Sequence, residues 1–176
     1  MPAKKIIIVG GGNAGLSTAA QLLKKDKSLQ ISIIDPSEKH YYQPAWTLVG
    51  AGVYDISKTV RNEKDYIPRG TTWIKDAVET FIPEENKLVC KSGTSYEYDA
   101  MIVCPGIQLD WNRVKGFKET LGKNNVTSNY SFDIAPYTWE LIKNFKGGTA
   151  VFTNPVGPVK CGGAPHKIMY LACDYW

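Results

Sequence analysis

The protein has 176 residues, of which 43% are hydrophobic and 22% charged, a composition typical of folded globular proteins and not of disordered or fibrous ones. Its 21 basic and 17 acidic residues give a net charge of +4 without a basic, aromatic-rich stretch, so nucleic acid is not an expected partner. Neither an apolar run long enough for a membrane span nor a signal or transit peptide is expected.

Residues 4–35 have the pattern of a β-α-β unit. The segment 4–9 is apolar and β-branched, as expected of a buried parallel strand. Residues 13–25 predict a helix, and residues 29–35 predict a second strand. The helix face predicted to be buried comprises Leu16, Ala19, Ala20 and Leu23.

The turn between the first strand and the helix contains a glycine fingerprint. Gly10, Gly12 and Gly15 fit the pattern G-x-G-x-x-G, and Asp35 follows 20 residues after Gly15. Glycines allow a tight turn and a close approach of a pyrophosphate to the backbone, while an acid at this distance accepts from a ribose hydroxyl. The pattern predicts dinucleotide binding, and both NAD and FAD fit it.

Short alternating segments follow at residues 72–81, 87–91 and 94–98, separated by turns at 83–86 and 92–93. They predict an antiparallel insertion of three strands. Residues 98–106 then predict another buried strand, which ends in the turn Pro105–Gly106.

The C-terminal residues place a thiol on a glycine-rich loop. Residues 147–155 predict a strand and residues 164–176 a helix, with Cys161 between them. Backbone N–H groups of Gly162 and Gly163, the helix N-terminus and the charge of Lys160 favour a thiolate there. The pattern predicts a reactive thiol with a lowered pKa, although a buried, inert thiol remains an alternative.

The other cysteines, at 90, 104 and 173, form no CxxC pair with Cys161 or with one another. Cys90 and Cys104 are interpreted as structural, and Cys173 as a core or surface position of the last helix. A zinc site from Cys161, His166 and Cys173 lacks a fourth ligand and the usual spacing.

Four segments carry a resemblance to a known family: residues 35–52, 105–111, 128–131 and 158–176. Together with the fingerprint and the Pro-Gly turn, they resemble the sulfide:quinone oxidoreductases among the flavoproteins with two dinucleotide-binding domains, and particularly the branch that includes the mitochondrial enzymes. The resemblance implies an α/β fold, with a Rossmann-like FAD-binding domain over residues 1–131 that contains the antiparallel β-meander. The start of a second Rossmann-like domain is implied over residues 132–176.

The resemblance also implies the cofactor and its site. FAD is favoured over NAD because NAD-only dehydrogenases lack the second turn. In the family, the pyrophosphate of FAD would contact the residues that match Gly10, Gly12, Asn13, Ala14 and Gly15, and the adenosine ribose would contact Asp35. The adenine would meet the backbone of Val78. Pro105 and Gly106 would lie close to the junction of phosphate and flavin, and Gln43 would approach the flavin side. Without the resemblance, Gln43 and its aromatic neighbours would be interpreted as an ordinary loop.

The implied chemistry is oxidation of sulfide, with two electrons passing through FAD to a quinone. Cys161 would be one of two redox cysteines. In the family the second one lies further along the chain, beyond the position that corresponds to Trp176. Sulfide would attack a disulfide or sulfur-bridged pair of cysteines and leave a persulfide on one cysteine and a thiolate on the other. An unknown acceptor would then take the sulfane sulfur. The expected location is cytoplasmic, with peripheral contact to the inner face of the cell membrane in a complete protein. A homo-oligomer is left open.

Two alternatives remain at this level. One is an FAD-binding module or fragment without catalysis. The other is a flavoprotein similar to NADH:quinone dehydrogenases, which would need a second glycine fingerprint that residues 154–163 do not supply.

Overall fold

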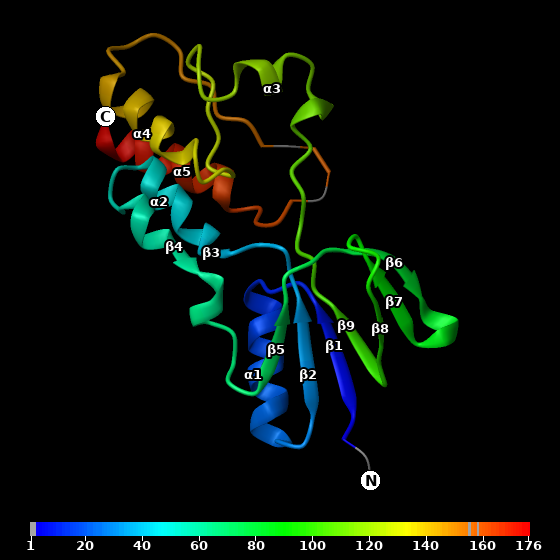
Figure 1. Ribbon diagram of the computed structural model, residues 1–176. Helices are drawn as coiled ribbons and strands as arrows, with labels where there is room; N and C mark the ends of the chain where they lie inside the picture. The colour runs from blue at the N-terminus through cyan, green and yellow to red at the C-terminus, as the bar shows by residue number, and fades with distance from the viewer. Residues whose placement is uncertain (1–2, 155, 158) are drawn as a thin grey trace. The chain divides into compact units, whose positions relative to one another are not determined.

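The computed structural model describes residues 3–154, 156–157 and 159–176. The chain forms two compact units (Figure 1). The first comprises Met1–Tyr41 and Arg61–Gly106, and the second comprises Tyr42–Val60 and Ile107–Trp176. The domain boundary expected at residue 131 in the complete family fold stays a prediction.

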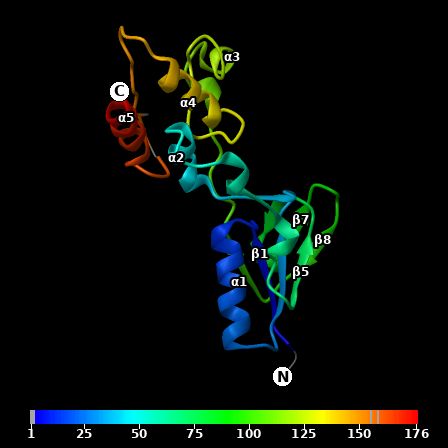
Figure 2. The same ribbon diagram turned by 90° about the vertical axis from the view of Figure 1, so that its left-hand side faces the viewer.

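The first unit is built on a parallel sheet. Within the described residues its strand order is β5-β2-β1-β9. The strands are β1 (Lys5–Val9), β2 (Gln30–Ile34), β5 (Thr71–Ile74) and β9 (Ala100–Val103). Helix α1 (Asn13–Lys25) joins β1 to β2 and covers one face of the sheet, and the predicted β-α-β unit is therefore confirmed (Figure 2).

Two apolar clusters lie on the two faces of this sheet. Under α1, Leu16 and Ala19 pack with Ile8, Ile31 and Ile33. The predicted helix face is correct for Leu16 and Ala19, and Leu23 is half-buried, but Ala20 is exposed. On the other face a cluster of alternate strand residues packs against the antiparallel insertion; its buried members are Ile7, Val9, Ile34, Leu88 and Cys90.

The insertion consists of three antiparallel strands in the described part of the chain, β6 (Val78–Ile82), β7 (Lys87–Cys90) and β8 (Ser95–Glu97). The single strand predicted over residues 72–81 was wrong, because β5 belongs to the parallel sheet and only β6 to the insertion. The chain turns between them at Asp76, whose carboxylate accepts a hydrogen bond from the backbone N–H of Ala77 at 2.7 Å.

Strand β9 is less buried than its sequence predicts. It pairs with β1 and forms one edge of the sheet in the described residues, and Val103 is 51% exposed. A strand is buried on both sides only when a further strand or helix covers it. The apolar composition of this segment therefore predicted correctly that it is a strand of the sheet, but it overestimated the burial of that strand.

The second unit is mostly helical. Its helices are α2 (Trp46–Gly50), α3 (Phe117–Thr120), α4 (Ala135–Asn144) and α5 (Ala164–Tyr175). Ala51, after α2, packs with Ile142 of α4 and Ile168 and Ala172 of α5. The predicted C-terminal helix is thereby confirmed. Leu171 is half-buried against the same cluster, whereas Tyr175, at the end of the helix, is exposed.

The strand predicted over residues 147–155 is wrong for residues 147–154, which form no strand, while Pro155 lies outside the described residues. Val151 is 77% exposed. A parallel strand satisfies its backbone N–H and C=O groups only through neighbouring strands, and the described chain supplies none here. An apolar sequence is therefore not sufficient to form a strand without a neighbouring strand to pair with.

The remaining short elements connect these parts. They are the paired strands β3 (Lys39–Tyr41) and β4 (Val60–Asn62), and the 3-10 turns η1 (Gln43–Ala45), η2 (Ile56–Thr59), η3 (Glu63–Asp65), η4 (Pro83–Glu85) and η5 (Trp111–Arg113). Among the helices described, none combines the length and the apolar character needed to cross a membrane.

Candidate functional site

The glycine loop between β1 and α1 allows three backbone segments to approach closely. A Cβ on Gly10, whose φ is +104°, would lie 2.1 Å from the carbonyl oxygen of Cys104. A Cβ on Gly15 would lie 1.9 Å from the carbonyl oxygen of Gly10. Neither position accepts a side chain, so these two glycines fix the loop beside the turn after β9.

Gly12 differs from the other two fingerprint glycines. A Cβ there would meet no atom of the described residues within 4 Å, and Gly12, Asn13 and Ala14 are exposed at the start of α1. The first N–H groups of a helix have no intrahelical acceptor and attract negative charge. The loop therefore offers open space and backbone donors at the place where a pyrophosphate would bind.

Asp35 follows β2 and lies against this loop. Its Oδ2 accepts from the backbone N–H of Gly11 at 2.6 Å, and its Oδ1 accepts from that of Ser37 at 2.7 Å. The indole N–H of Trp73 donates to the Asp35 carbonyl at 3.0 Å. Each carboxylate oxygen can accept more than one hydrogen bond, so a ribose hydroxyl can still be bound.

The second predicted turn meets the first at the end of the sheet. The nitrogen of Pro105 would lie 3.2 Å from a Cβ on Gly10, and Gly106 has a φ of +72° with open space around it. Parallel sheets bind ligands where the carboxyl ends of adjacent strands diverge. Val78 begins β6 and is half-buried against the cluster under the meander; its contact with adenine stays a prediction.

A pair formed by a buried glutamate and a half-buried histidine beneath the loop was missed by the sequence reasoning. Glu63 is 2% exposed, and its Oε2 lies 3.1 Å from Nδ1 of His40. Burial raises the pKa of the Glu63 carboxyl, while the charge and hydrogen bond of His40 act in the opposite direction. The two residues are 23 positions apart. Only the pairing of β3 with β4 brings them together, so no local pattern indicated them.

Gln43 and the loop of Cys161 meet within the second unit. The ammonium group of Lys160 donates to the side-chain oxygen of Gln43, which begins η1. Lys160 was expected to act on the neighbouring thiol of Cys161, but the structure shows its ammonium group bonded to the amide of Gln43.

Cys161 is exposed and its thiol is free. Its carbonyl accepts from the hydroxyl of Tyr130 at 3.3 Å and from the backbone N–H of Ala164 at 3.2 Å. Burial, together with the nearby Cys161, raises the pKa of Tyr130. The thiol therefore lies in solvent ahead of the 12-residue helix α5, so the alternative of a buried thiol is wrong.

The other cysteines are also free and differ in exposure. Cys90 is fully buried, and burial raises the pKa of its thiol, which agrees with a structural role. Cys104 is half-buried, and Cys173 is exposed on α5. The described residues contain no cluster of three His, Cys, Asp or Glu side chains suited to a metal.

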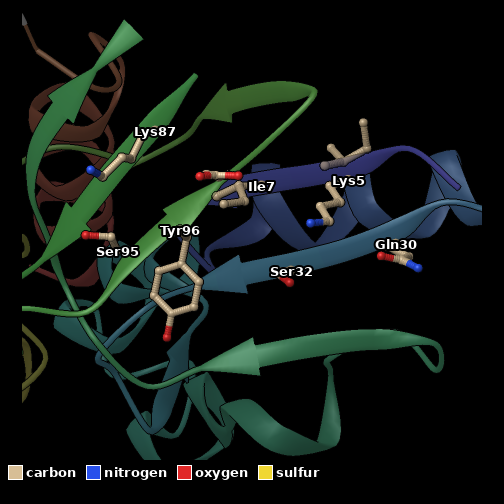
Figure 3. Close-up of a pocket in the computed structure, with 9 residues that line it drawn as sticks. Lys5, Ile7, Gln30, Ser32, Lys87, Ser95 and Tyr96 are labelled. Carbon is tan, nitrogen blue, oxygen red and sulfur yellow. The ribbon is translucent and has the colours of Figure 1, made fainter. Parts of the chain in front are cut away.

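A groove of about 540 Å³ opens between the parallel sheet and the meander (Figure 3). Lys5, Gln30 and Ser32 line it from β1 and β2, and Lys87 and Tyr96 line it from the meander. Lys5 and Gln30 begin their strands, whereas the glycine loop follows the end of β1. The groove is thus separate from the dinucleotide site.

Comparison with known proteins gives a consistent set of relatives. Residues 4–135 match the family described as pyridine nucleotide-disulphide oxidoreductase. The chain is 55% identical over 173 residues to the mitochondrial sulfide:quinone oxidoreductase of Dictyostelium discoideum, covering 97% of this chain and 38% of that protein. It is 41% identical over 172 residues to the mitochondrial sulfide:quinone oxidoreductase of Mus musculus, covering 98% and 38%.

The solved structure of the sulfide:quinone oxidoreductase from Aquifex aeolicus has the same fold. It matches with a TM-score of 0.65 and 23% identity, over 81% of this chain and 33% of that chain. The matched family consists of FAD-binding flavoproteins, and the predicted fold class, resemblance and cofactor are therefore confirmed. The chain spans 38% of the length of the two curated relatives.

Proposed function

We propose that this chain, which belongs to the pyridine nucleotide-disulphide oxidoreductase family, supplies the FAD-binding part of a sulfide:quinone oxidoreductase. The observation that carries the proposal is the glycine loop. Gly10 and Gly15 exclude any side chain, while Gly12 leaves open space in front of α1. The identity of 55% to a sulfide:quinone oxidoreductase gives this site its proposed reaction.

The residues of the first unit would bind and orient FAD. The start of α1 offers N–H groups to the pyrophosphate, and Asp35 offers its carboxylate to the ribose. When bound, FAD supplies a two-electron acceptor that passes the electrons on to a quinone. The residues proposed to contact it are Gly10, Gly12, Asn13, Ala14, Gly15, Asp35, Val78, Pro105 and Gly106, with Gln43 on the flavin side.

Cys161 would be one of the two cysteines that react with sulfide. Hydrosulfide would attack one sulfur of a disulfide between the two cysteines, the S–S bond would break, and a persulfide would form on the attacked cysteine. The other cysteine leaves as a thiolate, whose electron pair is the one that finally reduces the quinone. The exposure of Cys161 supports this role because sulfide needs access to the bridge. The second cysteine would come from residues outside this chain.

Quinone reduction would require contact with a membrane surface, and we propose that the complete protein makes it peripherally. The names of the two curated relatives include the word mitochondrial. The predicted cytoplasmic location, with contact to the inner face of the cell membrane, stays a prediction for this protein, as does a homo-oligomer.

The cofactor is tested directly by releasing it. The 176-residue chain, saturated with FAD and freed of excess by gel filtration, should release FAD on heating, identified by chromatography. A parallel sample incubated with NAD should retain none. Retention of NAD, or of neither cofactor by the folded chain, would contradict the proposed site.

The role of Cys161 is tested in the complete protein that contains this chain. Cys161→Ser should abolish sulfide-dependent quinone reduction while FAD stays bound, because a serine forms neither the sulfur bridge nor the persulfide. Cys173→Ser, which replaces another exposed cysteine on the neighbouring helix, is the matched control and should keep the activity. Normal turnover in the Cys161 variant would refute the proposed reaction. If sulfide never bleaches the FAD bound to the wild-type protein, a non-catalytic module is favoured instead.

A further inference from the structure

The Glu63 carboxyl lies directly beneath the glycine loop. A Cβ on Gly11 would be 2.8 Å from its Oε1 and 3.0 Å from the Cβ of Asp35. The two acids therefore flank Gly11. Within the described residues, Oε1 of Glu63 is buried without a hydrogen-bond partner, whereas the Asp35 carboxylate binds the backbone.

His40, on β3, is the residue whose side chain bonds the Glu63 carboxyl. Its ring is stacked on Tyr66 with the centroids 5.6 Å apart and the planes at 18°, and its side chain is 18% exposed. The ring is thus held in place by one contact on its face and one on its edge. A rotation of the ring out of its plane would break both contacts.

The other charged groups nearby have different partners. Lys39 donates to Asn62, and Lys75 pairs with Glu38 at 2.6 Å. The remaining charged neighbours in sequence, Arg61, Lys64 and Asp65, flank Glu63 on β4 and η3, where all three are exposed. Since helix α1 carries no ionisable side chain before Lys24, its first turn adds no charge to the cluster.

We propose that His40 and Glu63 are positioning residues of the dinucleotide site, that they share one proton, and that the cofactor's pyrophosphate binds with uptake of this proton. The inference rests on the proposed binding of FAD. With the proton, the pair is neutral overall and only Asp35 is negative beside the loop. Without it, two carboxylates face the segment that must receive a dianion.

Electrostatics fixes the sign of the effect. Like charges close to one another disfavour the ionised form, so a dianion at the loop makes the pair hold its proton more firmly. By linkage, the same proton makes FAD bind more tightly. Burial also raises the pKa of Glu63, which acts in the same direction as the added negative charge.

The test is calorimetric titration of the FAD-free 176-residue chain with FAD, in buffers of different ionisation enthalpy, between about pH 5.5 and pH 8, the range in which histidine titrates. The expected result is uptake of a fraction of one proton, and a Kd that rises with pH by at most about tenfold per unit, the limit for one linked proton. Glu63→Gln leaves the imidazole of His40 in place, so it should reduce both the proton uptake and the pH dependence of the Kd. The double variant Glu63→Gln with His40→Gln should bind FAD without proton uptake and with a Kd independent of pH.

His40→Gln provides a second variant, since its side chain is more exposed and the substitution is less disruptive to folding. It should also reduce the proton uptake, because only the Glu63 carboxyl of the pair remains. His166→Gln is the matched control, because the chain has two histidines and His166 lies exposed in the second unit; it should behave as the wild type. If FAD binds to the wild type without proton uptake, the inference is overturned while the proposed function stands. If FAD does not bind, both are overturned.

Discussion

The two units differ in how their proposed functional residues are held. In the first, the glycine loop is fixed by backbone atoms of three segments, and Gly10 and Gly15 leave no space for a methyl group. In the second, Cys161 lies exposed on a loop whose described contacts include hydrogen bonds accepted by its carbonyls and one donated by Lys160. The proposed cofactor site thus relies on close packing of the backbone, whereas the proposed reactive thiol relies on access from solvent.

The sharpest test of this difference is Gly15→Ala. Alanine is the better helix former by about 1 kcal/mol, but its Cβ would lie 1.9 Å from the backbone oxygen of Gly10. Backbone cannot move away as a flexible side chain does, so the clash should outweigh the gain. We expect a net loss of about 3 kcal/mol or more in the free energy of unfolding, measured with denaturant, and loss of FAD binding.

Gly12→Ala is the matched control for this substitution. Its φ of −67° suits alanine, and within the described part of the chain the new Cβ would meet no atom within 4 Å. The free energy of unfolding should change by less than about 0.5 kcal/mol, as for most exposed positions. FAD should nevertheless bind more weakly, because the methyl group occupies the space in front of α1. Equal destabilisation by the two substitutions would show that the close packing at Gly15 is not what holds the loop.

A smaller loss is expected from Gly52→Ala in the second unit. Gly52 has a φ of +76°, and a Cβ there would lie 2.4 Å from the ring of Trp139. The left-handed backbone costs alanine about 1 kcal/mol, and the displaced ring adds about 1 to 2 kcal/mol. Chemical denaturation followed by tryptophan fluorescence measures the sum.

Gly116→Ala separates these two costs. Gly116 has a nearly equal φ of +79°, and a Cβ there would meet none of the described atoms within 4 Å. Only the backbone cost of about 1 kcal/mol should therefore remain. If Gly52→Ala costs no more than Gly116→Ala, the packing of Trp139 against Gly52 contributes little to the second unit.

Much of the dinucleotide half could be predicted because its signals are local. Helix α1 begins and ends at the predicted residues, and the positive φ and close contacts of Gly10 are what a fingerprint glycine requires. Asp35 lies against the loop because two adjacent parallel strands end at the same edge of the sheet. In each case a short stretch of sequence determines the contact.

The features that were missed depend on contacts between distant residues. Residues 72–81 alternate as a strand, but the turn at Asp76 assigns their two ends to different sheets. The segment 147–154 is apolar enough for a strand but has no neighbouring strand to pair with in the described chain. Glu63 looks like one of many surface acids in the sequence, and only the fold buries it beside Gly11.

The difference between the units should also be visible in the cysteines without any substitution. Cys90, in the core of the first unit, is fully buried, and burial raises the pKa of its thiol, while Cys161 and Cys173 are exposed in the second unit. Because the thiolate is the nucleophile, Cys90 should be alkylated by iodoacetamide at least about tenfold more slowly than either exposed cysteine.

Mass spectrometry of peptides taken at successive times, over a series of pH values, gives all the rates in one sample. Cys173 serves as the internal reference for Cys161, since both are exposed and in the same unit. Access alone would give the two equal rates, whereas a thiolate favoured by the start of α5 would make Cys161 react faster at the lower pH values. Repeating the series in denaturant should remove both differences. Rapid alkylation of Cys90 in the native chain would mean that the core under the meander opens readily, which would contradict the tight packing assigned here to the first unit.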